Sequence, residues 1–411
     1  MKPSSLAAWG IVVCLCGVAI LNYLDRQVVF SLFPVLRHEL KMSDVQLGLI
    51  GSAFLLVYGV VSLFAGLLAV QWGLRRTILL SLAIWSVVIL VSGFVRSGTE
   101  LIALRALMGS SEAFYMPAGL AFVMLLHGEA TRSRATALHQ SGNHIGMVAG
   151  GTLGGWFAEH WSWRSGFFVL GAVGIVYAGF LAVVFRRLTP PETALDAPRM
   201  KVRELARVLI ALRGYPAMLA VFCLYSAAGW IVLAWMPLYL YEKFHMGLVE
   251  AGFSATFYFN VGSFTGIFLG AWASDRLAVR QASARLRLPA AGFLCSAVFL
   301  FAAAFAESRT VALAGLAIFG FGRGMYDCST MPLLCMIAPR DLRAGGYGVF
   351  NCAGCLTGAV MTALAGWLKA GFGLAGSIEA SAAGLLLAAW LMWKPITAAT
   401  RPVAAAGGPL P

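Results

Sequence analysis

The stretch ILNYLDRQVVFSLFPVL, residues 20–36, combines a long run of apolar residues with two adjacent charges, Asp25 and Arg26. It belongs to an apolar segment, residues 6–35, that is longer than the ~20 residues needed to span a bilayer. Similar segments recur along the whole chain of 411 residues, of which 60% are hydrophobic and 11% charged. Because typical soluble proteins have about 25% charged residues, the composition predicts an all-α membrane protein with many spans.

Twelve apolar segments predict twelve transmembrane helices. The first is too long for a cleaved signal peptide and is interpreted as a span. Since twelve is an even number, both termini are expected on the same side of the membrane. The predicted spans are residues 6–35, 45–71, 77–95, 100–126, 135–158, 166–185, 215–241, 250–273, 288–306, 310–337, 345–368 and 376–394.

The basic residues are distributed unevenly between the two sides of these spans. Twenty Lys and Arg lie on the side of the termini and seven on the other side. The positive-inside rule therefore predicts a multi-pass protein of the cell (inner) membrane with both termini in the cytoplasm. The net charge of +13 then reflects topology and attraction to anionic lipid, so the bilayer and not nucleic acid is the expected partner.

The longest polar segment, residues 186–216, divides the chain into two halves. We expect a first six-helix bundle at 1–186, a cytoplasmic linker with an amphipathic helix at 187–214, and a second six-helix bundle at 215–411. The halves resemble each other, since VQLGLIGSAF (45–54) is similar to VEAGFSATF (249–257). Gly109, Glu112 and Pro117 likewise recur at a constant spacing as Gly324, Asp327 and Pro332. Two pseudo-symmetric bundles predict a transporter with its site between them.

Two loops carry a resemblance to the major facilitator superfamily that extends over the whole chain. The segment GLLAVQWGLRR (66–76) resembles the superfamily's loop motif, with Val70 and Gln71 in place of its acid and arginine. The second copy, GAWASDRLAVR (270–280), keeps the acidic residue. The resemblance implies a role in cytoplasmic gating for Gly66, Gly73, Arg75, Arg76, Asp275 and Arg276.

Three further segments resemble the anion:cation symporter family, with the lysolipid-exporting spinster group as a near neighbour. They are NYLDR (22–26), RALMGSSEA (105–113) and MPLYL (236–240). The family includes carriers of sugar acids and other organic anions. The resemblance implies a carrier with no cofactor, driven by a proton or a sodium gradient, in which Asp25 and Glu112 are the proton sites. We expect the carrier to be a monomer.

Six charged residues lie inside predicted spans, where each costs about 2.5–3.5 kcal/mol on insertion scales. Guanidinium groups stay ionised and bind carboxylate or phosphate in a fork, so the three arginines are predicted to bind an anionic substrate. The three acids are predicted to carry protons. The alternative is that Asp25–Arg26 and Arg323–Asp327 are structural ion pairs. The six residues are Asp25, Arg26, Arg105, Glu112, Arg323 and Asp327.

Other polar and aromatic residues of the predicted spans are candidates for lining the cavity. His144 is a candidate for proton coupling, because imidazole titrates near neutrality. For all of these residues, packing or hydrogen bonding between helices is the alternative role. A glycine at every fourth position from 142 to 154 predicts close packing of that helix. The candidates for substrate binding are Gln140, Asn143, Tyr225, Trp230, Tyr258 and Asn351.

Together these features predict a secondary active transporter that works by alternating access. The favoured function is proton-coupled symport of a small organic anion such as a sugar acid. The main alternative is a proton-coupled exporter of amphipathic compounds, drugs or lysolipids, and a non-transporting sensor is a further one. The sequence lacks a Ser/His/Asp arrangement, an HExxH motif and clustered metal ligands, so neither an enzyme nor a metal site is expected.

Overall fold

The computed structural model describes residues 5–128, 131–188, 202–278, 284–339 and 342–393, and these residues are almost entirely helical. Their helices are α1 (Ser5–Ser31), α2 (Phe33–Glu39), α3 (Asp44–Trp72), α4 (Leu74–Ser92), α5 (Gly98–Glu112), α6 (Tyr115–Leu126), α7 (Arg132–His160), α8 (Trp163–Leu188), α9 (Val202–Ala211), α10 (Tyr215–Phe244), α11 (Leu248–Ala278), α12 (Ala284–Phe305), α13 (Arg309–Ile337) and α14 (Arg343–Leu391).

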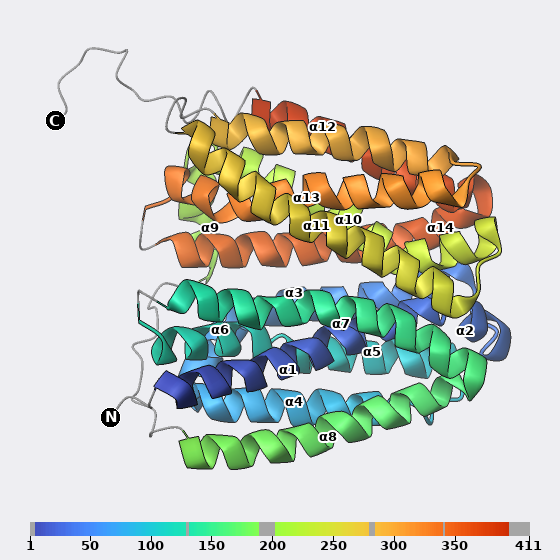
Figure 1. The fold of residues 1–411 in the computed structure, drawn as a ribbon, viewed down its shortest axis with the longest axis horizontal. Coiled ribbons are helices and arrows are strands. Elements are labelled where there is room, and N and C mark those ends of the chain that lie inside the picture. Colours follow the sequence, from blue (N-terminus) through green and yellow to red (C-terminus); the bar gives the residue numbers. More distant parts are fainter. Residues whose placement is uncertain (1–4, 129–130, 189–201, 279–283, 340–341, 394–411) are drawn as a thin grey trace.

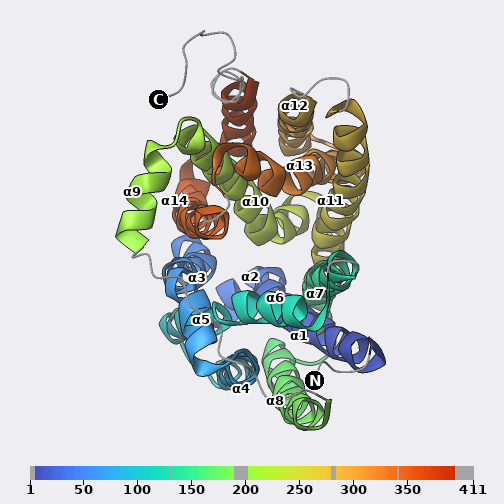
Figure 2. The same ribbon diagram turned by 90° about the vertical axis from the view of Figure 1, so that its left-hand side faces the viewer.

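The helices form two bundles that lie side by side (Figure 1). Helices α1 to α8 make the first bundle and α10 to α14 the second, and α9 packs against α10 and α14 at one end (Figures 1 and 2). We call the end at which α1 begins the terminal end, and the opposite end, where α2 lies, the distal end. Counting α5 with α6 as one segment and α14 as two, the described residues hold six membrane-length segments in each bundle. The predicted fold of twelve spans is therefore confirmed.

Hydropathy alone identifies only part of this set. Within the described residues, eight segments are long and apolar enough to cross a membrane by length and composition. Helices α7, α11 and α13 are not among them. Each of these three helices contains several glycines and polar side chains, which lower the mean hydropathy of the segment. They pack against other helices of the protein, so they do not need an apolar surface on every side.

Local breaks correct three of the predicted span boundaries. The first span ends at Ser31, and Pro34 near the start of α2 accounts for the break because it has no N–H to donate to the carbonyl of residue 30. The fourth span consists of α5 and α6, since Pro117 has no N–H to donate to the carbonyl of residue 113. The last two predicted spans run on in α14, which bends at Gly373, where φ is +65° and glycine is favoured.

Four glycines of α7 pack this helix against the backbone of α1. A Cβ on any of them would meet a main-chain oxygen of α1, so only glycine allows this approach. The predicted close packing is thus confirmed, and it fixes the helix that carries Asp25 and Arg26. The four glycines and the residues whose oxygens they face are Gly142 with Cys16, Gly146 with Ile20, Gly150 with Leu24 and Gly154 with Val28.

A repeated glycine lies at each of two seams between the bundles. A Cβ on Gly48 of α3 would lie 2.8 Å from the carbonyl oxygen of Thr362 in α14. Its counterpart in the repeat, Gly252 of α11, lies against the carbonyl of Gly151 in α7. Figure 2 shows these two helix pairs side by side on opposite flanks of the interface. The internal repeat therefore places one small residue at both contacts between the bundles.

Helix α9 follows the long polar segment of the chain and lies at the terminal end (Figure 1). Leu205 and Leu209 face Gly345 and Gly346 at the start of α14, while charged side chains such as Arg203 are exposed. A helix is thus present where an amphipathic one was expected. Residues 189–201 of the predicted linker lie outside the described residues.

Candidate functional site

The first bundle contains a buried ion pair between Arg26 of α1 and Glu112 at the end of α5. Arg26 Nε lies 2.6 Å from Glu112 Oε2, and both side chains are almost fully inaccessible. Three aromatic rings surround the guanidinium group, with centroids 4.6–4.9 Å from Cζ. Arg26 Nη2 and Glu112 Oε1 have no hydrogen-bond partner among the described residues. The pair therefore keeps one free donor and one free acceptor in an apolar setting. The three rings belong to Tyr23, Phe54 and Tyr58.

This pairing differs from one alternative suggested by the sequence. Arg26 does not pair with its neighbour Asp25, which is itself buried at 2% exposure. Consecutive residues of a helix point about 100° apart, so Asp25 faces away from Arg26. The alternative prediction of a structural Asp25–Arg26 ion pair is thus wrong, because Arg26 pairs with Glu112 instead.

Arg105 of α5 braces the backbone of α1. Its Nη1 donates to the carbonyl oxygen of Asp25 at 3.2 Å and its Nη2 to that of Arg26 at 3.4 Å. The residue is 1% exposed, and the ring of Phe54 lies 5.0 Å from its Cζ. Arg105 therefore holds α1 at the turn that carries Arg26. Its direct binding of a substrate stays a prediction.

The second bundle contains a more open pair, Arg323 and Asp327 of α13. Arg323 Nε lies 3.9 Å from Asp327 Oδ2, and the two side chains are 19% and 36% exposed. The hydroxyl of Tyr225 in α10 donates to Asp327 Oδ1, and the Tyr225 ring lies 4.2 Å from Arg323 Cζ. Arg323 Nη1 lies against Gly229 of α10. It has no hydrogen-bond acceptor in the described part of the chain.

Charge interactions link side chains of both bundles near these two pairs. Tyr23 of α1 interacts electrostatically with Arg26 of its own bundle and with Arg323 of the other. Tyr347 of α14 interacts with Tyr23 and with Asp327 in the same way. We infer that the two ion pairs face a common region at the bundle interface. The arrangement agrees with a site built from both halves of the repeat.

Several polar residues predicted to line the cavity make hydrogen bonds in this region. His144 Nδ1 of α7 lies 2.7 Å from Asn260 Oδ1 of α11, and Asn351 Nδ2 of α14 donates to Ser62 Oγ of α3 at 3.4 Å. Both bonds join the two bundles. His144 also interacts electrostatically with Asp327. These contacts place His144 and Asn351 at the interface, and their roles in transport stay predictions.

The remaining candidates contact their own helix or one neighbouring helix. Asn143 donates to Gln140 on the same helix at 3.1 Å, and Trp230 packs against Gly358 of α14. Tyr258 packs edge-on against Phe257, with ring centroids 5.6 Å apart, and is 36% exposed. No described contact joins Tyr258 to either arginine pair.

The residues implied in gating lie at the terminal end, around the α3–α4 and α11–α12 connections. Gly73, which separates α3 from α4, has a φ of +88°, a value that favours glycine. Arg75 and Arg76 occupy the first turn of α4, and Arg276 lies over the ring of Trp272 near the end of α11. Gly66 and Asp275 occupy the terminal halves of α3 and α11. The gating roles of these residues stay predictions.

A charge cluster at the distal end, which we call the distal square, was not predicted from the sequence. Arg37 of α2 and Lys369 of α14 each contact both Asp44 of α3 and Glu242 of α10. The sequence analysis treated its two basic members only as loop charges. The repeat could have signalled it, because Arg37 and Glu242 stand eight and seven residues before the similar segments at 45 and 249.

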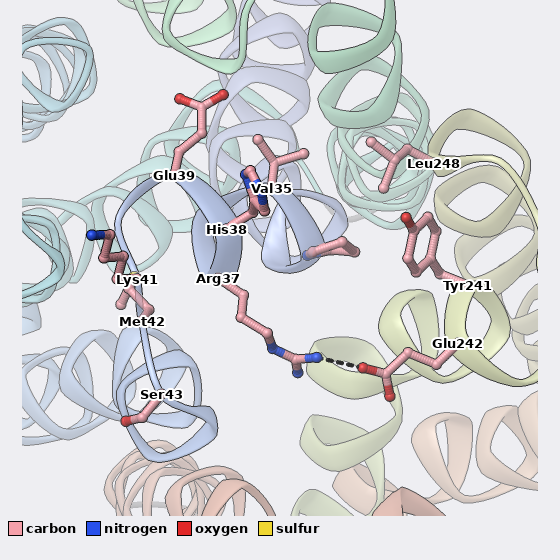
Figure 3. A pocket seen from close by; sticks show the side chains of 11 residues that line it. Val35, Arg37, His38, Glu39, Lys41, Met42, Ser43, Tyr241, Glu242 and Leu248 are labelled. Atoms are coloured by element: carbon pink, nitrogen blue, oxygen red, sulfur yellow. Dashed lines mark hydrogen bonds and ion pairs between the residues drawn. The ribbon is translucent and has the colours of Figure 1, made fainter.

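The distal square borders a cavity of about 760 Å³. Figure 3 shows Arg37 reaching toward Glu242 across this cavity, while Glu39 and Lys41 point away from the pair. Tyr241 and Leu248 line the side formed by the second bundle. The cavity therefore lies at the distal end of the interface and is bordered by the ion pairs of the distal square.

Known proteins resemble this chain over nearly its full length. It is 26% identical over 401 residues to the D-galactonate transporter of Escherichia coli O6:H1, covering 90% of this chain and 91% of the relative. It is 28% identical over 384 residues to the Bacillus subtilis protein named "Probable galactarate/D-glucarate transporter GudP", covering 84% and 82%. The crystal structure of a bacterial homolog to the human lysosomal transporter Spinster superposes with a TM-score of 0.81 and 18% identity, covering 97% of this chain and 98% of the homolog.

The family assignment follows from these matches together with the fold. The sequence profile of the Major Facilitator Superfamily matches residues 15–362, which is most of the chain. The two bundles and their internal repeat are the architecture expected for such a transporter. The chain belongs to the Major Facilitator Superfamily and is a membrane transporter, not an enzyme.

Proposed function

We propose that this chain is a proton-coupled symporter of small organic anions of the sugar-acid class. The observation that carries the proposal is the buried Arg26–Glu112 pair, in which the guanidinium group keeps a free donor at Nη2. The similarity to the D-galactonate transporter and to the probable galactarate/D-glucarate transporter supports the substrate class. We place the terminal end in the cytoplasm and the distal end outside, and we expect a monomer in the cell (inner) membrane.

The coupling follows from the charge balance of this pair. With Glu112 ionised, its carboxylate occupies the Nε side of Arg26. A substrate carboxylate that joined them would leave a net negative charge in an apolar setting, which is costly. Protonation of Glu112 removes that charge and releases the guanidinium group for a forked contact with the substrate. Proton and anion therefore bind together, and neither binds well alone.

Transport assays in proteoliposomes test this proposal. We expect uptake of D-galactonate to be driven by an inward proton gradient and to be abolished by a protonophore. Arg26→Ala should abolish uptake while the protein remains folded in the membrane. Arg309→Gln is a matched control, because Arg309 forms an exposed ion pair with Glu250 at 3.1 Å. Full uptake by Arg26→Ala would refute the binding role, and uptake that requires sodium would refute proton coupling.

The alternative function is export of amphipathic compounds. Ligand binding distinguishes it from sugar-acid symport. Purified protein should unfold at a higher temperature in the presence of sugar acids, because a ligand that binds only the native state stabilises it. Stabilisation by lysolipids, with none by sugar acids or dicarboxylates, would favour the exporter.

A further inference from the structure

The second bundle supplies a charge pair of its own. We propose that Arg323 and Asp327 form a second site for one carboxylate and one proton, so that the preferred substrate is a short dicarboxylic acid carried with two protons. This inference rests on the proposed function and narrows its substrate class. Each end of the diacid would face one bundle, with Arg26 binding one carboxylate and Arg323 the other.

The geometry of Arg323 supports ligand binding more than a purely structural pairing. A structural pair at i and i+4 needs only a close contact between the two side chains. Here the closest oxygen, Asp327 Oδ2, is 3.9 Å from Arg323 Nε, beyond hydrogen-bond distance. The partner oxygen Oδ1 instead accepts from the hydroxyl of Tyr225. Arg323 is therefore held near Asp327 without being hydrogen-bonded by it.

Aromatic rings and a glycine fix the position of this guanidinium group. The rings of Tyr225 and Phe259 lie 4.2 Å and 5.4 Å from Arg323 Cζ. Nη1 lies against Gly229, where a side chain would displace it. These contacts stabilise the cation without using its N–H groups. The N–H groups of Arg323 are thus held in position, and Nη1 has no hydrogen-bond partner among the described residues. This arrangement suits the recognition of an anion.

Charge balance gives the stoichiometry. Each bundle contributes one arginine and one acid to the common region, Arg26 with Glu112 and Arg323 with Asp327. A substrate with two carboxylates brings two negative charges, and protonation of both acids offsets them. The loaded carrier then has the same net charge as the empty one, so the complete cycle moves no net charge. A monocarboxylate would engage only one of the two arginines.

Other groups face Asp327 and share its electrostatic setting. They are Arg323 on its own helix, Tyr225 of α10, His144 of α7 and Tyr347 of α14. Of these, His144 is the alternative carrier of the second proton. Its Nδ1 lies 2.7 Å from Asn260 Oδ1. The variant His144→Gln distinguishes the two acceptors.

A pair of acids with the same carbon chain tests the proposal. The assay measures counterflow of labelled D-galactonate in proteoliposomes. The two competitors are unlabelled D-gluconate, a monoacid, and unlabelled D-glucarate, the corresponding diacid. We expect the diacid to inhibit at concentrations at least about tenfold lower, because a second charge-assisted contact is formed. Arg323→Gln should weaken diacid binding about tenfold more than monoacid binding. Arg309→Gln should leave the ratio unchanged.

Electrical recordings test the second proton. Uptake of the diacid by the wild type should produce no net current. Asp327→Asn should make the same uptake electrogenic, since one proton is lost per cycle, while His144→Gln should keep it electroneutral. Should these variants fail to fold, thermal-shift titrations of the wild type with the two acids still measure the diacid preference.

The outcomes separate this inference from the function on which it depends. Equal inhibition by the two acids in the wild type, or an unchanged ratio in Arg323→Gln, would overturn the dicarboxylate assignment while leaving sugar-acid transport intact. Current in the wild type, or its appearance in His144→Gln and not in Asp327→Asn, would overturn the role of Asp327. Absence of transport and binding for both acids would overturn the proposed function itself.

Discussion

Arg37 of α2 and Glu242 of α10 are joined across the two bundles by an ion pair of 2.6 Å at the distal end. Each also has a partner within its own bundle, since Arg37 contacts Asp44 and Lys369 contacts Glu242. Separation of the bundles at this end would break Arg37–Glu242 and Lys369–Asp44 but preserve the two pairs inside the bundles. Every charge therefore keeps a partner in both arrangements, which lowers the cost of opening compared with four isolated charges.

The distal square should bias the carrier toward the arrangement closed at this end. Glu242→Gln removes one acid that bridges the bundles and should shift the equilibrium toward the open arrangement. The members are partly exposed, so the effect should be about 0.5–1 kcal/mol, or a two- to fivefold change in population. Spin labels at the exposed distal positions Thr99 and Glu307 would report the separation of the two bundles. Glu250→Gln is the matched control, and identical distance distributions in all three proteins would contradict a gating role.

Arg105 should matter for stability as well as for transport. Arg105→Ala removes two hydrogen bonds from a charged group to the α1 carbonyls, each worth about 1.5–3 kcal/mol, so it should lower the free energy of unfolding by about 3–5 kcal/mol. Arg323→Ala should cost less, because that side chain is 19% exposed and its acid lies 3.9 Å away. Thermal unfolding in detergent measures both. Equal melting temperatures for Arg105→Ala and the wild type would show that the bracing of α1 is unimportant.

Glu112 should determine the response of transport to pH. Glu112→Gln keeps the size of the side chain but holds it neutral, which mimics the protonated state. We expect this variant to exchange labelled for unlabelled substrate while its net uptake no longer responds to a proton gradient. Glu100→Gln is the control on the same helix, because Glu100 is exposed in the first turn of α5 and accepts from the backbone N–H of Arg96. Net uptake by Glu112→Gln that still follows the gradient would assign the proton to another acid.

Much of the fold could be predicted from the sequence because it depends on local composition. Apolar segments and the positions of Lys and Arg predict twelve spans, and the internal repeat predicts two bundles. Helix ends were less accurate, since the effect of Pro34 on α1 or of Pro117 on α5 depends on whether neighbouring helices compensate for the lost hydrogen bond. Gly373 likewise bends α14 where the sequence predicts a separate loop.

The partners within the site could not be predicted in the same way. Arg26 and Glu112 are 86 residues apart, and the sequence indicates only that both are buried charges. Their pairing depends on the position of α1, which packs against the glycines of α7. The distal square depends on four elements whose charges look like ordinary loop residues. The sequence therefore identifies the charged residues that are costly to bury, and the packing of the helices determines which of them form contacts.

Gly229 should be required for the second anion site. Arg323 Nη1 occupies the space that a Cβ at this position would fill, so Gly229→Ala should displace the guanidinium group from the Tyr225 ring. Because Ala is a better helix former than Gly, the substitution should not harm α10 itself. We expect weaker diacid binding by about tenfold, measured by competition against labelled substrate. Gly179→Ala is the matched control, since a Cβ there meets no described atom within 4 Å. If Gly229→Ala and Gly179→Ala bind the diacid equally well, the position of Arg323 against α10 does not determine recognition, and its role as an anion site fails with it.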